Sequence, residues 1–148
     1  MPFTLDDSLW PLLVIHLSGT STDVEYEKFL EQLAGVLNRR EPYFSIVDTS
    51  QSGLPNSAQR QRQVEWSRTH DELERTWGRG TVFIVTSPFV RVAMSLYFHV
   101  RPQHVPHVSV ADMGSALVWI AERMESTGFK AEAERVRQHL SSLSQRTA

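Results

Sequence analysis

Hydrophobic residues along the chain follow two alternating patterns, short continuous apolar runs and longer segments with a helical period. Four runs of strand length predict strands buried on both faces of a sheet. They are Leu12–Leu17, Tyr43–Val47, Thr81–Thr86 and His107–Val110. A shorter strand at Phe3–Leu5, followed by turn-forming residues at Asp6–Ser8, predicts a hairpin at the start of the chain.

Five segments carry the period of a helix. The first is the clearest, because Thr22 and Glu25 form a capping box just before an apolar stripe. The five segments span about residues 22–38, 57–77, 88–100, 112–128 and 129–143. We expect the tail from Ser141 to Ala148 to fray, because chain ends make few contacts.

The second helix changes character along its length. Its later turns carry an apolar stripe at Trp66, His70, Leu73 and Trp77. This stripe predicts that the later turns pack against the sheet. The first turns, Gln59–Gln63, are polar on every face. We therefore expect the first half of this helix to stay in water or to face a ligand.

The third helix, about residues 88–100, is apolar almost all round. Such a helix is either fully buried or part of an interface. We expect Met94, Tyr97 and Phe98 to reach either a self-interface, which would make the protein a homodimer, or an apolar cavity. Simple burial under the last helix is an equally good alternative.

Strands that alternate with helices imply a mainly parallel sheet joined by right-handed crossovers. We predict a single α/β domain with a mostly parallel sheet of four or five strands, an N-terminal hairpin strand and helices packed against the sheet. Residues 1–128 form this domain. Residues 129–148 add a C-terminal amphipathic helix, with its frayed tail, that packs on the same domain.

This order of elements resembles the STAS domain over roughly Phe3 to Gly128. That family includes bacterial anti-sigma-factor antagonists and small stand-alone bacterial proteins. A local feature adds to the resemblance, because Asp48 ends a strand and Ser52-Gly53-Leu54 follows in the next loop. Anti-sigma-factor antagonists have a phosphorylatable serine in such a loop, at a helix N-terminus. In this chain Ser50-Gln51 stand where that family has an aspartate and a further serine.

The predicted loop from Thr49 to Asn56 also has a physical argument of its own. Ligands and partners of open parallel sheets meet the carboxyl ends of the strands, and a helix N-terminus there suits an anion or a phosphoserine. The candidate interaction or phosphorylation residues are Asp48, Ser50, Ser52, Ser57, Arg60 and Arg62. The alternative is that they are solvated residues of an ordinary loop.

Composition and motifs narrow the chemistry further. The 148 residues contain no cysteine, which excludes a disulfide scaffold, a thiolate zinc site and a cysteine nucleophile. The net charge of −2 gives no long-range attraction to nucleic acid. Three histidines, His99, His104 and His107, lie close together, but their spacing matches no common metal motif. We predict no catalytic residues, no cofactor and no metal.

These patterns favour a non-enzymatic regulatory or protein-interaction module of a bacterial cytosol, acting through the loop after the second long strand. The alternative is a small apolar-ligand or lipid binding protein that uses a cavity beside the third helix. An interaction module predicts exposed loop serines and no enclosed cavity. A ligand-binding protein predicts a pocket of several hundred Å³ lined by the third helix. We expect no membrane-spanning segment, because no apolar stretch approaches about 18 residues.

Overall fold

The computed structural model describes residues 2–100, 102 and 104–147, with side chains as far as Leu143. Five strands form one sheet, in which the strands lie side by side in chain order. They are β1 (Phe3–Leu9), β2 (Leu12–Gly19), β3 (Tyr43–Ser52), β4 (Gly78–Ile84) and β5 (His107–Val110). Strands β1 and β2 pair antiparallel, and all other neighbours pair parallel. The fold class predicted from the sequence is therefore confirmed.

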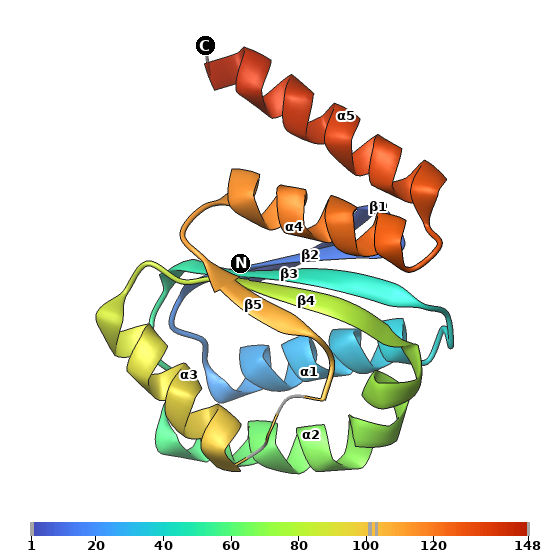
Figure 1. The fold of residues 1–148 in the computed structure, drawn as a ribbon. Coiled ribbons are helices and arrows are strands. Elements are labelled where there is room, and N and C mark those ends of the chain that lie inside the picture. Colours follow the sequence, from blue (N-terminus) through green and yellow to red (C-terminus); the bar gives the residue numbers. More distant parts are fainter. Residues whose placement is uncertain (1, 101, 103, 148) are drawn as a thin grey trace.

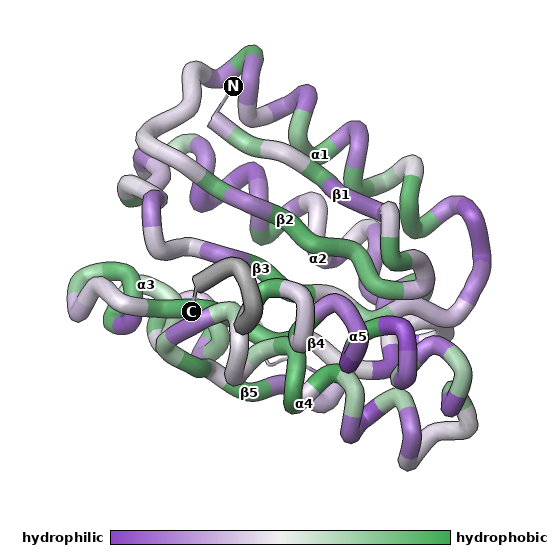
Figure 2. The backbone as a smooth tube through the Cα atoms, turned by 90° about the horizontal axis from the view of Figure 1, so that it is seen from above, coloured by the Kyte–Doolittle hydropathy of each residue, from purple (hydrophilic) through white to green (hydrophobic). Residues whose placement is uncertain are grey.

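Helices cover both faces of the sheet (Figure 1). Three of them lie on one face: α1 (Asp23–Leu37), α2 (Ser57–Trp77) and α3 (Pro88–Val100). The other face carries α4 (Met113–Ser126), and α5 (Lys130–Thr147) packs on α4. Hydrophilic and hydrophobic residues alternate along the coil of helix α1, as expected for a helix with one apolar stripe (Figure 2). Its capping box at Thr22 and Glu25 is formed, with the Glu25 N–H donating to the Thr22 hydroxyl at 3.2 Å.

The N-terminal hairpin is longer than predicted. We expected a turn at Asp6–Ser8, but β1 continues to Leu9 and the turn lies at Trp10–Pro11. The cause is pairing across the hairpin, because Asp6 lies opposite Val14 and Leu9 lies opposite Leu12. Exposed edge-strand positions can be polar, so the polar stretch did not end the strand.

Strand β3 also continues beyond the predicted end. We expected a loop from Thr49, but the strand runs to Ser52. Pairing with β2 extends it, because Gln51 and Ser52 lie opposite Ser18 and Gly19. The Thr49 hydroxyl also donates to the Ile84 carbonyl at 2.6 Å, which ties this part of β3 to β4. The connection to α2 is therefore only residues 53–56.

Strand β4 begins earlier than predicted. We expected this strand to begin at Thr81, but β4 follows α2 directly at Gly78, which lies opposite Tyr43. A side chain at Gly78 would come within 2.7 Å of the Glu74 carbonyl oxygen. Glycine therefore allows the helix to pass straight into the strand.

The two faces of the sheet carry separate hydrophobic cores. Thirteen buried residues, with further half-buried side chains around them, form the core under α4 and α5. Phe44 and Ile46 of β3 belong to that core, and Phe129 packs edge-on against Phe44 at 5.4 Å between ring centroids. Seven buried residues, including Leu13 and Ile15 of β2, form the core under α1 and α2.

Candidate ligand-binding site

A cavity of about 330 Å³ lies on the face of the sheet that carries α1, α2 and α3. Strands β2, β3 and β4 form its floor through side chains such as Ile15, Val47 and Phe83. The inner side of α3 forms another wall with Val90, Ala93, Met94, Tyr97 and Phe98. Two prominent surfaces of the cavity are thus mainly apolar.

Helix α2 contributes a wall of a different kind. Its lining residues on the side toward α3 are Arg60, Gln63, Ser67, Asp71 and Glu74. They follow one another at intervals of three or four residues, which places them on one face of the helix. A bond of 2.5 Å between the Ser67 and Tyr97 hydroxyls links this face to α3.

Hydroxyl groups on the floor of the cavity are bonded within the protein. Ser45 and Thr81 lie side by side on β3 and β4, with 3.0 Å between their hydroxyl oxygens. Both residues are buried, as is Thr49. Burying a hydroxyl that already has a hydrogen-bond partner costs little free energy. An apolar ligand can therefore cover the floor without leaving these polar groups unpaired.

All three tyrosines of the chain line the cavity. Burial raises the pKa of Tyr26 above its ordinary value, and Tyr97 and Glu27 add to this effect. Burial also raises the pKa of Tyr43, with a smaller contribution from Glu74. The Tyr26 hydroxyl donates to Oε1 of Gln63 at 3.1 Å. Both tyrosines therefore stay neutral over the whole physiological pH range.

Aromatic rings that line the cavity pack against one another and against neighbouring histidines. Phe98 of α3 packs against Phe83 of β4 and His107 of β5, with 5.4 Å between ring centroids in both pairs. Trp66, a buried lining residue of α2, stacks on His70 at 4.1 Å between ring centroids. His70 is thus packed against an aromatic ring, in line with its position in the predicted stripe.

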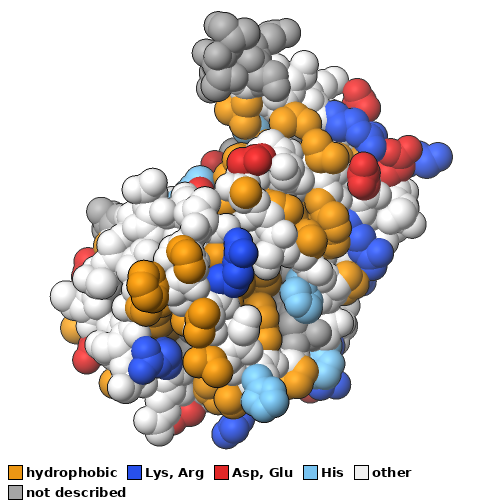
Figure 3. All heavy atoms as spheres, turned by 60° about the vertical axis from the view of Figure 1, so that its left-hand side comes forward, with side chains coloured by type: hydrophobic (Ala, Val, Ile, Leu, Met, Phe, Trp, Pro, Cys, Tyr) orange, Lys and Arg blue, Asp and Glu red, His pale blue; other side chains and the backbone are white. Residues whose placement is uncertain are grey.

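The outer side of α3 exposes a second apolar stripe. Phe89, Val92, Leu96 and Val100 are 77%, 60%, 65% and 59% exposed. Hydrophobic side chains gather on this face among arginines and histidines (Figure 3). The predicted candidates Met94, Tyr97 and Phe98 are instead half-buried and line the cavity. A self-interface through α3 stays a prediction.

The six loop candidates do not form one surface. Asp48 lies on the α4 side of the sheet, because it shares a face of β3 with Ile46, and its carboxylate is 3.3 Å from Nδ1 of His16. Its other oxygen accepts from the Ser50 N–H at 3.0 Å. Ser52 and Arg60 line the cavity instead. The candidates thus divide between the two faces.

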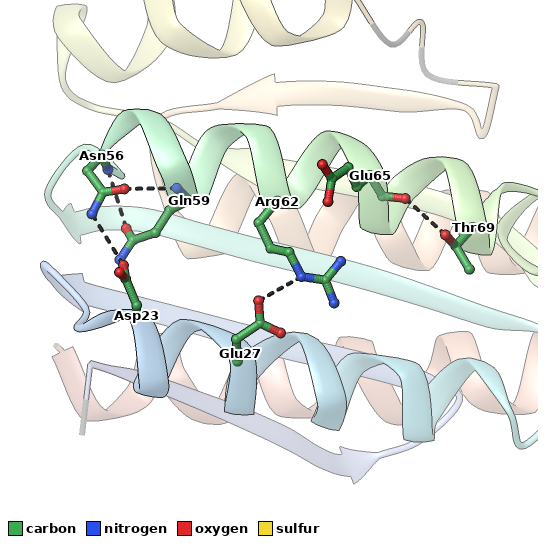
Figure 4. Close-up of polar contacts among 7 residues, drawn as sticks. All are labelled: Asp23, Glu27, Asn56, Gln59, Arg62, Glu65 and Thr69. Atoms are coloured by element: carbon green, nitrogen blue, oxygen red, sulfur yellow. Dashed lines mark hydrogen bonds and ion pairs between the residues drawn. The ribbon is translucent and has the colours of Figure 1, made fainter.

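The N-terminus of α2 is largely satisfied by the protein itself. Asn56 and Gln59 form a capping box, and the Gln59 amide also donates to Asp23 of α1 at 3.1 Å (Figure 4). Arg60 donates to the Pro55 carbonyl at 3.0 Å, and Arg62 donates to Glu27 at 2.6 Å. Within the described residues Arg62 is thus already paired with a carboxylate, whereas the contact of Arg60 is to a neutral carbonyl.

Close packing explains why a glycine stands at Gly53 in the Ser52-Gly53-Leu54 step. A Cβ atom at Gly53 would lie 2.8 Å from Cγ2 of Thr20 and 3.2 Å from the Gly19 carbonyl oxygen. Its N–H donates to that same carbonyl at 2.8 Å. Ser57 is exposed at the first position of α2, whereas Ser52 is half-buried and donates to the Gly53 carbonyl at 2.7 Å.

Two further features of the described residues concern metals and membranes. Histidine, aspartate and glutamate side chains with defined positions form no group of three or more that could hold a metal ion. His104 bonds to Arg75 at 2.8 Å, and His107 belongs to the aromatic cluster. No helix in the same part of the chain combines the length and hydrophobicity needed to cross a bilayer.

Two solved structures share this arrangement of strands and helices. An uncharacterized protein of the DUF3478 family with a SpoIIAA-like fold, from Shewanella loihica PV-4, has a TM-score of 0.60 at 15% identity and covers 79% of this chain and 90% of its own. The anti-sigma factor antagonist SpoIIAA in its unphosphorylated form has a TM-score of 0.57 at 19% identity and covers 80% of this chain and 96% of its own. The fold is STAS-like. The resemblance in element order is thereby confirmed at the level of structure.

The STAS-like fold is what these comparisons establish. No family model matches the sequence, and no curated protein matches it. The residues of the cavity therefore have to be interpreted from their own chemistry. Sequence reasoning anticipated the polar first turns of α2 but missed Ser67, Asp71 and Glu74. The signal that was available is their spacing with Gln63, which continues one polar face along the helix.

Proposed function

We propose that this STAS-like domain binds an apolar small molecule in the cavity between α2, α3 and the sheet. The observation that carries the proposal is the cavity of about 330 Å³ with apolar side chains from three strands and α3. Small-molecule sites are typically concave, mainly apolar and equipped with a few placed polar groups, with volumes from about 300 Å³ upward. The cavity has each of these properties.

The exposed apolar stripe of α3 supports the same proposal. Only Val90 among the described residues of α3 is buried, and this helix covers the cavity from the side. A helix held by few buried side chains can shift at low energetic cost. Such a shift would give a ligand access to the apolar floor.

Filling the cavity tests this function. Ala93→Phe places a ring into the space beneath α3, whereas Ala131→Phe adds the same ring at an exposed position of α5. We expect native mass spectrometry and titration with an apolar fluorescent dye, 1-anilinonaphthalene-8-sulfonate, to detect binding by the unmodified protein. Ala93→Phe should weaken dye binding at least tenfold, and Ala131→Phe should leave it unchanged. Equal binding by all three proteins would refute the cavity as the site.

We also propose a second function, a regulatory contact with a protein partner at the carboxyl ends of β3 and β2. Structural similarity to an anti-sigma factor antagonist supports it, as do the exposed Gln51 and Ser57 near that edge. A photo-crosslinking amino acid at Gln51, introduced in living cells, should trap one defined partner. The same amino acid at the exposed Gln138 of α5 should not, and identical patterns from both positions would count against this contact. Both proposals concern binding and not catalysis.

A further inference from the structure

The polar wall of α2 limits which apolar molecule the cavity can hold. From Arg60 to Glu74 the lining face spans fifteen residues, whose fourteen steps correspond to about 21 Å along a helix axis. Polar side chains thus accompany a ligand along much of its length. A ligand with a single polar head would meet them mostly with its hydrocarbon part.

Gln63 lies in the middle of this wall, and its hydrogen bonds show why a mainly apolar ligand would bind poorly there. Its Oε1 accepts from Tyr26, but within the described residues its amide nitrogen, which carries two N–H donors, has no hydrogen-bond partner. An apolar ligand that covers these donors displaces the water bound to them and offers no hydrogen-bond acceptor in its place, which weakens binding. A ligand with oxygen atoms on that side replaces the water.

The surfaces opposite α2 are apolar and therefore require an apolar side of the ligand. Val90, Ala93 and Met94 of α3 and Val47 and Phe83 of the sheet present hydrocarbon and aromatic surface. Hydroxyl groups of the ligand turned toward these side chains would lose their own hydrogen bonds. The two sides of the ligand must therefore differ in polarity.

Charge distinguishes the two ends of the wall. Arg60 lies near the N-terminus of α2, where the helix dipole is positive. Within the described residues its guanidinium makes one hydrogen bond, to the neutral carbonyl of Pro55 in the preceding loop. Asp71 and Glu74 lie at the other end, where Asp71 is paired with Arg75 at 2.8 Å. An anionic group is therefore attracted to the Arg60 end of the wall.

From these features we infer that the ligand is a facially amphipathic organic acid. It has an apolar body with hydroxyl groups along one side, and it lies lengthwise against α2. Its carboxylate is next to Arg60, its hydroxyl-bearing side faces Gln63 and Ser67, and its apolar side faces α3 and the sheet. This inference rests on the proposed ligand-binding function, which it makes more specific.

Two probes with the same head group test the inference. Deoxycholate is a rigid carboxylate with hydroxyl groups on one face, and palmitate is a carboxylate with a wholly apolar chain. Calorimetric titration of the full chain, below the micelle concentration of each probe, should show binding of deoxycholate at least tenfold tighter than that of palmitate. Gln63→Leu, an exchange of similar shape, should abolish this preference, and Gln63→Met provides a second variant. Arg60→Gln should weaken both acids about tenfold.

Matched controls lie on the exposed side of the same helix. Gln61→Leu and Arg68→Gln should change neither affinity, because neither side chain lines the cavity. Equal affinities for the two acids, or a preference that survives in both Gln63 variants, would overturn the inference while leaving an apolar-ligand function intact. If the acids and the fluorescent dye all fail to bind, the proposed function itself fails.

Discussion

The two faces of the sheet follow different packing rules. Under α4 and α5, β3 and β4 contribute Phe44, Ile46 and Val82, each 0% exposed, to a continuous core. On the opposite face, the same strands contribute Ser45, Thr81 and Phe83 to the floor of a cavity. One set of strands thus supports a close-packed layer on one face and, on the other, a smaller core with a cavity beside it.

This difference indicates that one face mainly stabilises the fold and the other can bind a ligand. Close packing supplies most of the stability, because apolar burial is the main favourable contribution to folding. The core under α4 and α5 can therefore stabilise the domain while the face beneath α3 remains available to a ligand. Helix α3 illustrates the consequence, since it has apolar residues on both sides and buries only Val90 among its described residues.

The largest expected effect contrasts one large side chain from each face. Leu117 of α4 is 1% exposed within the packed core, so Leu117→Ala should lower the free energy of unfolding by about 3 kcal/mol. Met94 of α3 is half-buried and borders the cavity, so Met94→Ala should cost less than about 1 kcal/mol. Urea denaturation followed by circular dichroism measures both values.

Equal losses in the two variants would contradict the comparison. They would mean that α3 is packed as tightly in solution as α4. The conservative exchange Leu117→Met keeps most of the side-chain volume and should cost less than about 1.5 kcal/mol. It therefore separates a packing effect from a general sensitivity of α4 to substitution.

Sequence patterns predicted the local elements of both faces well. The predicted strands at residues 12–17 and 43–47 and the capping box at Thr22 were correct, because each depends on signals within a few residues. The errors were at Asp6–Ser8 and Thr49–Ser52, where polar residues continue a strand. Their extended conformation depends on partners in β2 and β4, which are distant in the sequence.

The cavity was predicted as one of two alternatives, and its polar wall was only partly foreseen. Along α2, the face that contains Gln63 and Ser67 has the same sequence pattern as a face exposed to water. Only the position of α3, linked to it by the hydroxyls of Ser67 and Tyr97, makes it the wall of a site. Local patterns contain no information about that position.

A second prediction uses the tyrosines, because all three lie on the open face. Burial raises the pKa of Tyr26 and Tyr43 above the ordinary value of 10.0, so these hydroxyls keep their protons in the folded state while the unfolded chain loses them. Their contribution is complete below pH 10.0 and declines as the pH rises above it. Each group should cost up to about 1.4 kcal/mol per pH unit in that range.

Unfolding in urea at a series of pH values from neutral to about pH 11 measures this decline. Tyr43→Phe removes one ionisable group, so its stability should fall less steeply above pH 10.0 than that of the unmodified protein. A Tyr43→Phe protein with the same slope as the parent would show that this hydroxyl is solvated, and that the open face is wetter than its geometry indicates.

The smallest effects, which should have opposite signs, come from two glycines. On the packed face, a Cβ atom at Gly80 would lie 3.0 Å from Cζ3 of Trp119 and 3.1 Å from Cγ of Arg123, so Gly80→Ala should cost about 1 kcal/mol. Gly35 of α1, on the other face, has open space where a Cβ would be. Gly35 lies in the last turn of α1, so Gly35→Ala should stabilise the protein by about 0.5 kcal/mol, because alanine has fewer conformations in the unfolded chain. Thermal unfolding of both variants and the double variant measures these shifts.

Since the two sites lie on opposite faces, the shifts should be additive. A clear departure from additivity would mean that the two faces are energetically coupled.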